Sequence, residues 1–112
     1  MNYEIRHYCN ANGTNVFGDW LDGLTDQKAR ANIAARMDRL QLGLFGDSKS
    51  LAEAEGVCEL RINYGPGYRV YYVMLGTLCV LLLFGGDKRK QSSDIDRALA
   101  YLKDYKERSG TP

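Results

Sequence analysis

The chain has 112 residues, of which 45% are hydrophobic and 26% charged, and its formal net charge is +1. This length suits one globular domain and is short for two, so we expect residues 1–112 to form a single domain. The longest apolar run, 78–84, has seven residues, far fewer than the roughly 20 that a membrane-spanning helix needs. Glu4 and Arg6 stand where a signal peptide would be apolar. We therefore expect a cytoplasmic protein without membrane association.

The residues do not indicate disulfide or metal chemistry. The three cysteines, Cys9, Cys58 and Cys79, are widely spaced, and His7 is the only histidine. Such a set forms neither a disulfide framework nor a zinc site, which predicts reduced, mostly buried thiols and a packed or surface histidine. The acidic residues lack metal-ligand spacing, and the motifs of P-loops, serine hydrolases and zinc proteases are absent. We therefore expect no metal and no cofactor.

The N-terminal half predicts one strand and two helices. Residues 3–8 alternate in polarity, as a strand does, and apolar residues then recur at helical spacing from Val16 to Leu24. Thr25 is a predicted N-cap for a second helix, whose apolar stripe is Ile33, Met37, Leu40 and Leu44. Its cations lie largely outside this stripe, which favours a solvated face: Lys28, Arg30, Arg36 and Arg39. The segment "FGDSKS" is predicted to end this helix.

The C-terminal half predicts three strands and a last helix. From Val57 the apolar period changes to two on both sides of "GPG", and residues 78–84 are apolar on both parities, as in a central strand covered on both faces. A basic loop, 85–91, then leads to a helix capped by Ser92 or Ser93, with a buried stripe of Ile95, Leu99, Leu102 and Tyr105. The order β-α-α-β-β-β-α predicts an α+β fold with helices packed on a small antiparallel sheet.

The segment "ELRINYGPGYRVYY" places two arginines in an apolar hairpin. A turn centred on Pro66 groups the apolar residues on the core side, and it pairs Arg61 with Tyr71 and Asn63 with Arg69 on the other face. The residues alone leave two interpretations open. The arginines are surface residues paired with a nearby carboxylate, a contact of little consequence. Alternatively they form a phosphate site, because a guanidinium stays charged and offers a planar fork of donors.

Cations are more frequent in the half of the chain that contains this hairpin. Residues 57–112 hold nine Lys/Arg against six Asp/Glu, whereas residues 1–56 hold six against eight. The run Lys88, Arg89 and Lys90 follows the strand expected beside the hairpin and is suited to further phosphate contacts.

Residues 56–105 resemble the RelE/ParE superfamily of bacterial toxins, and most closely the branch called addiction module killer protein, which is grouped near HigB. The likeness covers nearly the whole chain. Its most specific parts are "ELRINYGPGYRVYY", "LLLFGGDKRKQ" followed by "DIDRA", "FGDWLDGL" and "RLQLGLFGDSKSL". The resemblance implies a RelE-like, microbial-ribonuclease-like fold and the role of toxin in a type II toxin–antitoxin system.

RelE-like members of this superfamily are metal-independent, ribosome-dependent endoribonucleases that cut messenger RNA in the A site and so inhibit translation. The resemblance therefore implies the ribosome and mRNA as partners. It also implies a helix-turn-helix antitoxin, through which the complex binds operator DNA. Carried over by motif, the catalytic residues would be Arg61, Arg69, Tyr71, Lys88 and Lys90. We further expect four residues to bind RNA: Asn63, Arg89, Arg36 and Arg39.

The sequence departs from the family at its C-terminal end. Many RelE-like toxins have a catalytic tyrosine, histidine or acid there, whereas Tyr101 and Tyr105 of this chain lie inside the predicted last helix. Proton transfer then falls to Lys88 or Lys90, or to the ribosome. Two alternatives stay open: a ParE-like DNA gyrase poison, which shares the fold and the strand arginines, and a non-catalytic module that binds an antitoxin.

Overall fold

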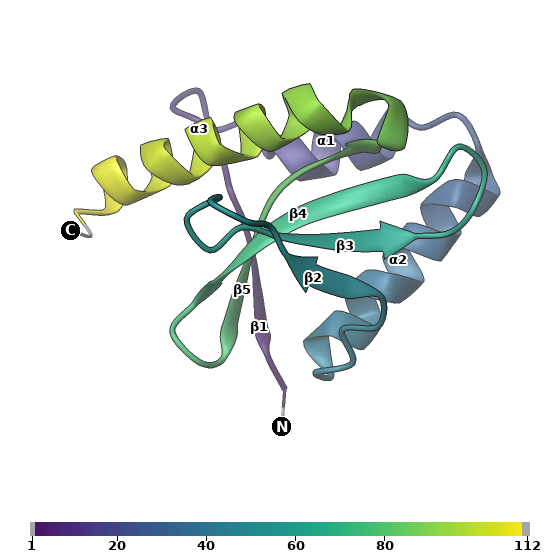
Figure 1. Ribbon diagram of the computed structural model, residues 1–112, viewed down its shortest axis with the longest axis horizontal. Coiled ribbons are helices and arrows are strands. Elements are labelled where there is room, and N and C mark those ends of the chain that lie inside the picture. Colours follow the sequence, from purple (N-terminus) through teal and green to yellow (C-terminus); the bar gives the residue numbers. More distant parts are fainter. Residues whose placement is uncertain (1, 111–112) are drawn as a thin grey trace.

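The computed structural model describes residues 2–110, which form a five-stranded sheet with helices on both faces (Figure 1). The strands are β1 (Glu4–His7), β2 (Ser48–Ser50), β3 (Cys58–Ile62), β4 (Tyr68–Leu75) and β5 (Cys79–Asp87), in the spatial order β1-β5-β4-β3-β2. Neighbouring strands are antiparallel, except that β1 pairs parallel to β5. The predicted α+β class is confirmed, with one strand more than expected.

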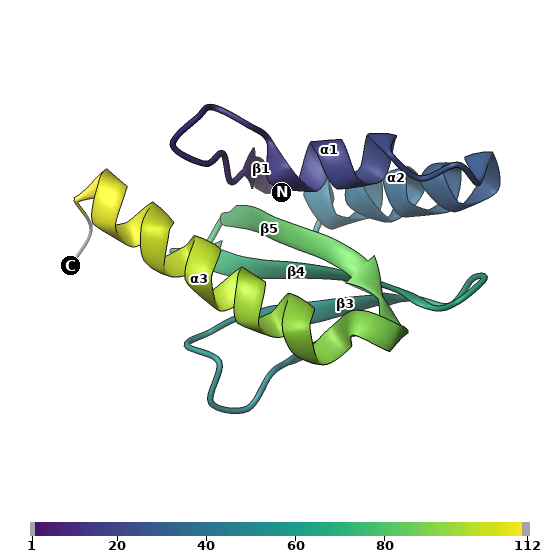
Figure 2. The same ribbon diagram turned by 90° about the horizontal axis from the view of Figure 1, so that it is seen from above.

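Two helices pack on one face of the sheet and the third on the other (Figure 2). These are α1 (Val16–Asp22) and α2 (Gln27–Gln41) on the first face, and α3 (Gln91–Ser109) on the second. The carboxylate of Asp26 accepts the N–H groups of Lys28 and Ala29, so Asp26 is the N-cap of α2 and the prediction of Thr25 was wrong. Leu44 lies beyond the end of α2 and is 58% exposed, so it does not extend the apolar stripe.

The additional strand, β2, comes from the segment that was predicted only to end a helix. Its three residues are polar, and the burial of the strand is intermediate to exposed. It pairs with β3 at the edge of the sheet, with Lys49 opposite Glu59. A run this short carries no readable alternation of polarity, so only the pairing itself identifies it.

The chain passes from β5 into α3 without the predicted basic loop. The strand continues through Gly85 and Gly86 to Asp87, and a 3₁₀ turn, η1 (Lys88–Lys90), leads directly into α3 at Gln91. The Asp87 carboxylate caps this turn by accepting the N–H of Arg89 at 2.9 Å. The predicted caps Ser92 and Ser93 both lie inside α3, and that prediction was wrong.

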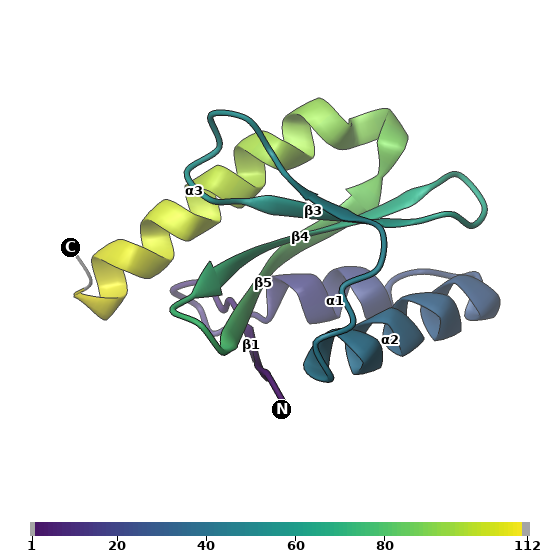
Figure 3. The same cartoon turned by 60° about the horizontal axis from the view of Figure 1, so that its bottom comes forward.

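Two hydrophobic layers enclose the sheet. One lies against α1 and α2 and includes Phe17, Ile33, Leu40, Leu60, Val70 and Leu82. The other lies under α3 and includes Val57, Tyr71, Leu81, Leu83, Ala98 and Leu102. Figure 3 shows the strands between α3 on one side and α1 and α2 on the other, and β5 is buried on both faces as predicted. None of the helices within residues 2–110 has the length and apolar content needed to cross a membrane.

Candidate functional site

The β3–β4 register places Arg61 directly opposite Arg69. The N–H of Gly67 donates to the carbonyl of Tyr64 at 3.0 Å, closing a tight turn in which Gly65 has a φ of +56°. The hairpin is therefore centred one residue earlier than the predicted Pro66, and the strand pairs differ by two residues. A shift of two keeps every strand side chain on its face, so the predicted division into faces holds within β3 and β4, although the predicted cross-strand partners were wrong.

A single buried carboxylate connects the two arginines. Oε1 of Glu59 lies 2.9 Å from Nε of Arg61 and 3.4 Å from Nε of Arg69, and Nε2 of Gln91 donates to Oε2 at 2.5 Å. The Glu59 side chain is 0% exposed, whereas Arg61 is 35% and Arg69 15% exposed. The hydrogen bond to Glu59 raises the pKa of Arg61, and burial opposes this only in part. Two guanidiniums thus share one negative charge, and of their two Nε atoms only that of Arg61 donates a hydrogen bond to it within residues 2–110.

The sequence predicted that Tyr71 lies at the surface beside the arginines, and this prediction was wrong. It lies opposite Glu59 under α3 and is 0% exposed. Burial raises the pKa of Tyr71, the charges of Glu59 and Asp94 raise it further, and Arg69 opposes them. Its hydroxyl has no hydrogen-bond partner within residues 2–110. Tyr71 is therefore a protonated, packed phenol at neutral pH rather than a base at the surface.

Two lysines from neighbouring elements add positive charge beside the arginines: Lys88 of the 3₁₀ turn η1 and Lys49 of β2. A Cβ atom built on Gly67 would lie 3.5 Å from Cδ of Lys88 and 3.7 Å from Nη1 of Arg69, so both side chains flank Gly67. Lys49, which the sequence analysis missed, lies opposite Glu59 across β2–β3 and shares its face. Both lysines are exposed. We call this group the cationic face: Lys49, Arg61, Arg69 and Lys88.

The other two members of the basic run lie elsewhere. Arg89 is exposed and pairs with Asp87 at 2.8 Å. Lys90 lines a pocket between α1 and α3, together with Trp20 and Asp94. Successive residues of a 3₁₀ turn point about 120° apart, which explains why Lys88 and Lys90 are not side by side. The structure brings only Lys88 of this run to the arginines.

The remaining predicted RNA-binding residues meet on the α2 side of the sheet. Arg36, Arg39 and Asn63 line a hollow of about 210 Å³ between α2 and the end of β3. Arg36 donates to the backbone carbonyls of Arg61, at 2.7 Å, and Phe45, at 3.2 Å. Burial lowers the pKa of Arg36, and the charge of Arg39 lowers it further. Asn63 thus belongs to this hollow and not to the face of Arg69.

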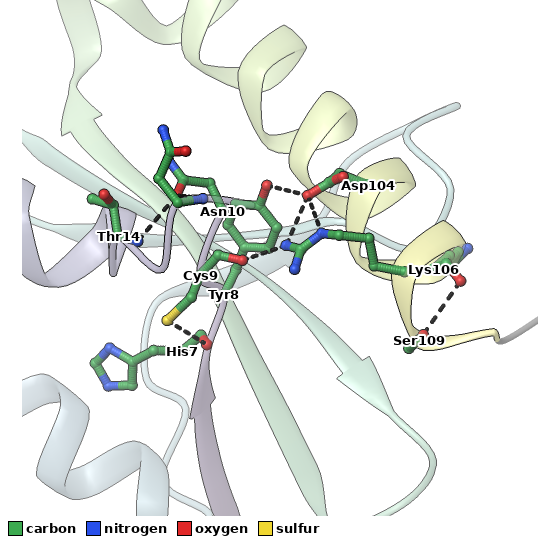
Figure 4. Close-up of polar contacts among 10 residues, drawn as sticks. His7, Tyr8, Cys9, Asn10, Thr14, Asp104, Lys106 and Ser109 are labelled. Atoms are coloured by element: carbon green, nitrogen blue, oxygen red, sulfur yellow. Dashed lines mark hydrogen bonds and ion pairs between the residues drawn. The ribbon is translucent and has the colours of Figure 1, made fainter.

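A second polar cluster joins the end of β1 to the C-terminal half of α3 (Figure 4). The Tyr8 hydroxyl donates to Oδ2 of Asp104 at 2.6 Å, and Arg108 contacts both Asp104 and the carbonyl of Cys9. His7 points away from this cluster in Figure 4, is exposed, and contacts Asn15. Its prediction as a packed or surface histidine is confirmed. The cluster joins these two chain segments, and none of its residues belongs to the cationic face.

The cysteines are free but not buried. Cys9 is exposed, and Cys58 and Cys79 are partly exposed, so the expectation of mostly buried thiols was wrong. Within residues 2–110, no three His, Cys, Asp or Glu side chains are grouped as metal ligands would be.

Comparison with known proteins agrees with this architecture. Residues 19–103 match the family model described as phage derived protein Gp49-like. An uncharacterised protein of Haemophilus influenzae is 48% identical over 85 residues, which cover 76% of this chain and 84% of that protein. The structure of a mutant E. coli toxin RelE in the free state aligns with a TM-score of 0.64 at 12% identity, covering 89% of this chain and 96% of that one. The chain therefore belongs to the Gp49-like family, a family of RelE-like toxins.

Proposed function

We propose that this toxin inhibits translation by cleaving messenger RNA in the ribosomal A site, with the cationic face as its active surface. The observation that carries the proposal is the pair of arginines held by one buried carboxylate. Glu59 accepts a hydrogen bond from Nε of Arg61 and forms an ion pair with Nε of Arg69, while the Nη atoms of Arg61 have no hydrogen-bond partner within residues 2–110. Guanidiniums fixed in advance stabilise the charge that grows on a phosphodiester during cleavage, without a cost of reorganisation at that moment.

The reaction is the attack of a ribose 2′-oxygen on the adjacent phosphorus with loss of the 5′-oxygen. Arg61 and Arg69 hold the phosphate oxygens, and Lys88, which flanks Gly67 beside Arg69, donates a proton to the departing 5′-oxygen. The 2′-hydroxyl proton leaves to a group of the ribosome or to solvent. The products are a 2′,3′-cyclic phosphate and a free 5′-hydroxyl. Tyr71 has no part in this scheme because it is fully buried.

A toxin of this family is expected to have a cognate antitoxin. We propose a small helix-turn-helix antitoxin that covers the cationic face and carries the complex to operator DNA. The hollow of Arg36, Arg39 and Asn63 is available on the α2 side for ribosomal RNA, because Arg39 is exposed and has no ion pair within residues 2–110, while Arg36 is held by two backbone carbonyls. The ribosome and messenger RNA are cytoplasmic, so the proposed function implies that the protein acts in the cytoplasm.

The proposal is tested by inducing the chain without its partner and mapping new RNA 5′ ends. The expected result is growth arrest with 5′ ends inside translated codons, and loss of both in Lys88→Ala. Lys103→Ala, which removes an exposed lysine of α3, is the matched control and should behave as wild type. Intact RNA together with trapped gyrase–DNA complexes would instead favour a gyrase poison. Arrest-free growth with normal accumulation of the protein would favour a non-catalytic antitoxin-binding module.

A further inference from the structure

A pocket of about 350 Å³ opens between α1 and α3, beside the C-terminal end of β5. Strand β1 pairs with β5 only as far as Leu82, so the edge of β5 from Gly85 to Asp87 has no strand beside it on that side. Figure 2 shows β5 passing between α1 and α3 before the chain turns into α3. The lining residues with functional side chains are Trp20, Asp87, Lys90, Ser93, Asp94 and Arg97. The sequence analysis assigned only Lys90 of these to a site.

At two glycines of β5, side chains that line the pocket contact the strand backbone directly. A Cβ atom on Gly85 would lie 2.3 Å from ring atoms of Trp20, and one on Gly86 would lie 1.9 Å from Oδ2 of Asp94. No other residue type fits either position without moving these side chains. Successive strand residues face opposite sides of the sheet, so the Gly-Gly pair lets the indole approach one face of β5 and the carboxylate the other, where the pocket opens at the edge of the strand.

The carboxylate of Asp94 has no hydrogen-bond donor. Asp94 is 4% exposed, and its Oδ2 has no partner within residues 2–110. Burial raises the pKa of Asp94, whereas the charges of Arg97 and Lys90 lower it. A buried carboxylate without donors is costly, and such a group is retained where a ligand supplies the donors. A ligand with two neighbouring N–H donors would supply the hydrogen bonds that the Asp94 carboxylate lacks.

We propose that this pocket binds the guanine base of an RNA nucleotide. Guanine presents two neighbouring N–H donors, at N1 and the 2-amino group, which match the two oxygens of Asp94. Adenine and cytosine each present an acceptor beside a donor, and uracil has one donor between two acceptors, so a carboxylate repels them. Trp20 contacts the base plane, and Lys90 and Arg97 attract its phosphate.

An arginine side chain from a protein partner also offers paired donors. Its positive charge would meet Lys90 and Arg97 as well as Asp87 and Asp94, whereas a nucleotide can present a neutral base to Asp94 and its anionic phosphate to Lys90 and Arg97, and this favours the nucleotide. The inference rests on the proposed function for the RNA context only. Binding of a free nucleotide is measured without any cleavage.

Trp20 is the only tryptophan of the chain and reports directly on the pocket by its fluorescence. GMP should quench it saturably, with AMP, CMP and UMP binding at least about 10-fold more weakly, since a hydrogen bond to a charged group is worth about 10- to 100-fold in affinity. IMP, which lacks the 2-amino group, should also bind more weakly than GMP. This comparison needs no variant.

Asp94→Asn should remove the preference for GMP, whereas Asp96→Asn, at an exposed position of α3 that does not line the pocket, should retain it. Equal quenching by all nucleotides, equal affinity for GMP and IMP, or undiminished GMP binding by Asp94→Asn would overturn the inference. Stronger quenching by an arginine amide than by GMP would overturn it in favour of a protein partner. If GMP binds but RNA stays intact in cells, the proposed ribonuclease fails and the pocket stands; cleavage without GMP binding is the reverse case.

Discussion

Arg61 and Arg69 face each other across the β3–β4 ladder, and the Nε atoms of both lie within 3.4 Å of the same carboxylate oxygen. Like charges at directly opposite positions destabilise a sheet. The buried Glu59 compensates for this repulsion by pairing with both guanidiniums, and its hydrogen bond fixes that of Arg61. The pair is thus held at a position where stability alone would not favour two cations, which is what a phosphate-binding surface requires.

Removal of the shared carboxylate should strongly destabilise the protein. We expect Glu59→Ala to lower the free energy of unfolding by about 3 kcal/mol, because it leaves opposed arginines without a counter-charge. Urea unfolding measures the change, and Glu107→Ala at an exposed position of α3 should stay within about 0.5 kcal/mol of wild type. An unchanged midpoint for Glu59→Ala would show that Glu59 does not hold the arginine pair.

Loss of one guanidinium should reduce the cleavage rate far more than the stability of the fold. Arg69→Ala removes a donor to the phosphate, and removal of one such donor typically lowers the rate by about 10²-fold or more. It also deprives Glu59 of one of three partners, while Arg61 and Gln91 remain. Cleavage rate and urea midpoint should therefore be measured on the same preparation. A rate that falls only in proportion to the folded fraction would point to a structural role.

Tyr71→Phe should leave cleavage unchanged and should not lower stability at neutral pH, because the hydroxyl that it removes is buried without a hydrogen-bond partner. The wild-type pKa of Tyr71 is raised on folding, chiefly by burial. Its contribution to stability is therefore complete below the ordinary tyrosine value of about 10 and is lost as pH rises above it. Urea midpoints of both proteins from neutral to strongly alkaline pH check this. The variant should lose less stability at the alkaline end, and a parallel decline would contradict the burial of this phenol.

Gly86→Ala should destabilise the protein through a specific clash. An added Cβ would lie 1.9 Å from Oδ2 of Asp94, and overpacking of this kind costs about 1–3 kcal/mol. In an Asp94→Ala background most of that cost should disappear, since the clashing atom is gone. The two single variants and the double variant form a thermodynamic cycle that isolates the contact. Additive changes in unfolding free energy would contradict the close approach.

The parts of the fold that follow from a strong local pattern were predictable from the sequence. Residues 78–84 are apolar on both parities and supply most of β5, an interior strand buried on both faces, and the alternation on each side of "GPG" assigned the side chains of β3 and β4 to their faces. The register was wrong because it depends on the turn, where Gly65 rather than Pro66 lies at the centre. The burial of Tyr71 and Glu59 was not predictable, since it depends on where α3 packs.

The candidate site was likewise predictable only in part. The proximity of Arg61 and Arg69 was predictable from period two, but Lys49 was not, because its strand is three polar residues long. The separation of Lys88 from Lys90 arises from a 3₁₀ turn where a loop was expected. The sequence does contain an indication of Asp94, because it is an acidic residue in the first turn of a helix that follows a Gly-Gly pair. Its burial appears only once α3 is placed over β5.

The central claim is that the cationic face cleaves RNA on the ribosome. Its most direct test mixes the purified toxin with ribosomes that hold a defined messenger RNA, and maps the cut and its ends. We predict one cut within the A-site codon, leaving a 2′,3′-cyclic phosphate and a 5′-hydroxyl. The cut should be at least about 10²-fold slower with Arg69→Ala and absent when the ribosome is omitted. Messenger RNA that stays intact on the ribosome with wild-type toxin would contradict the account.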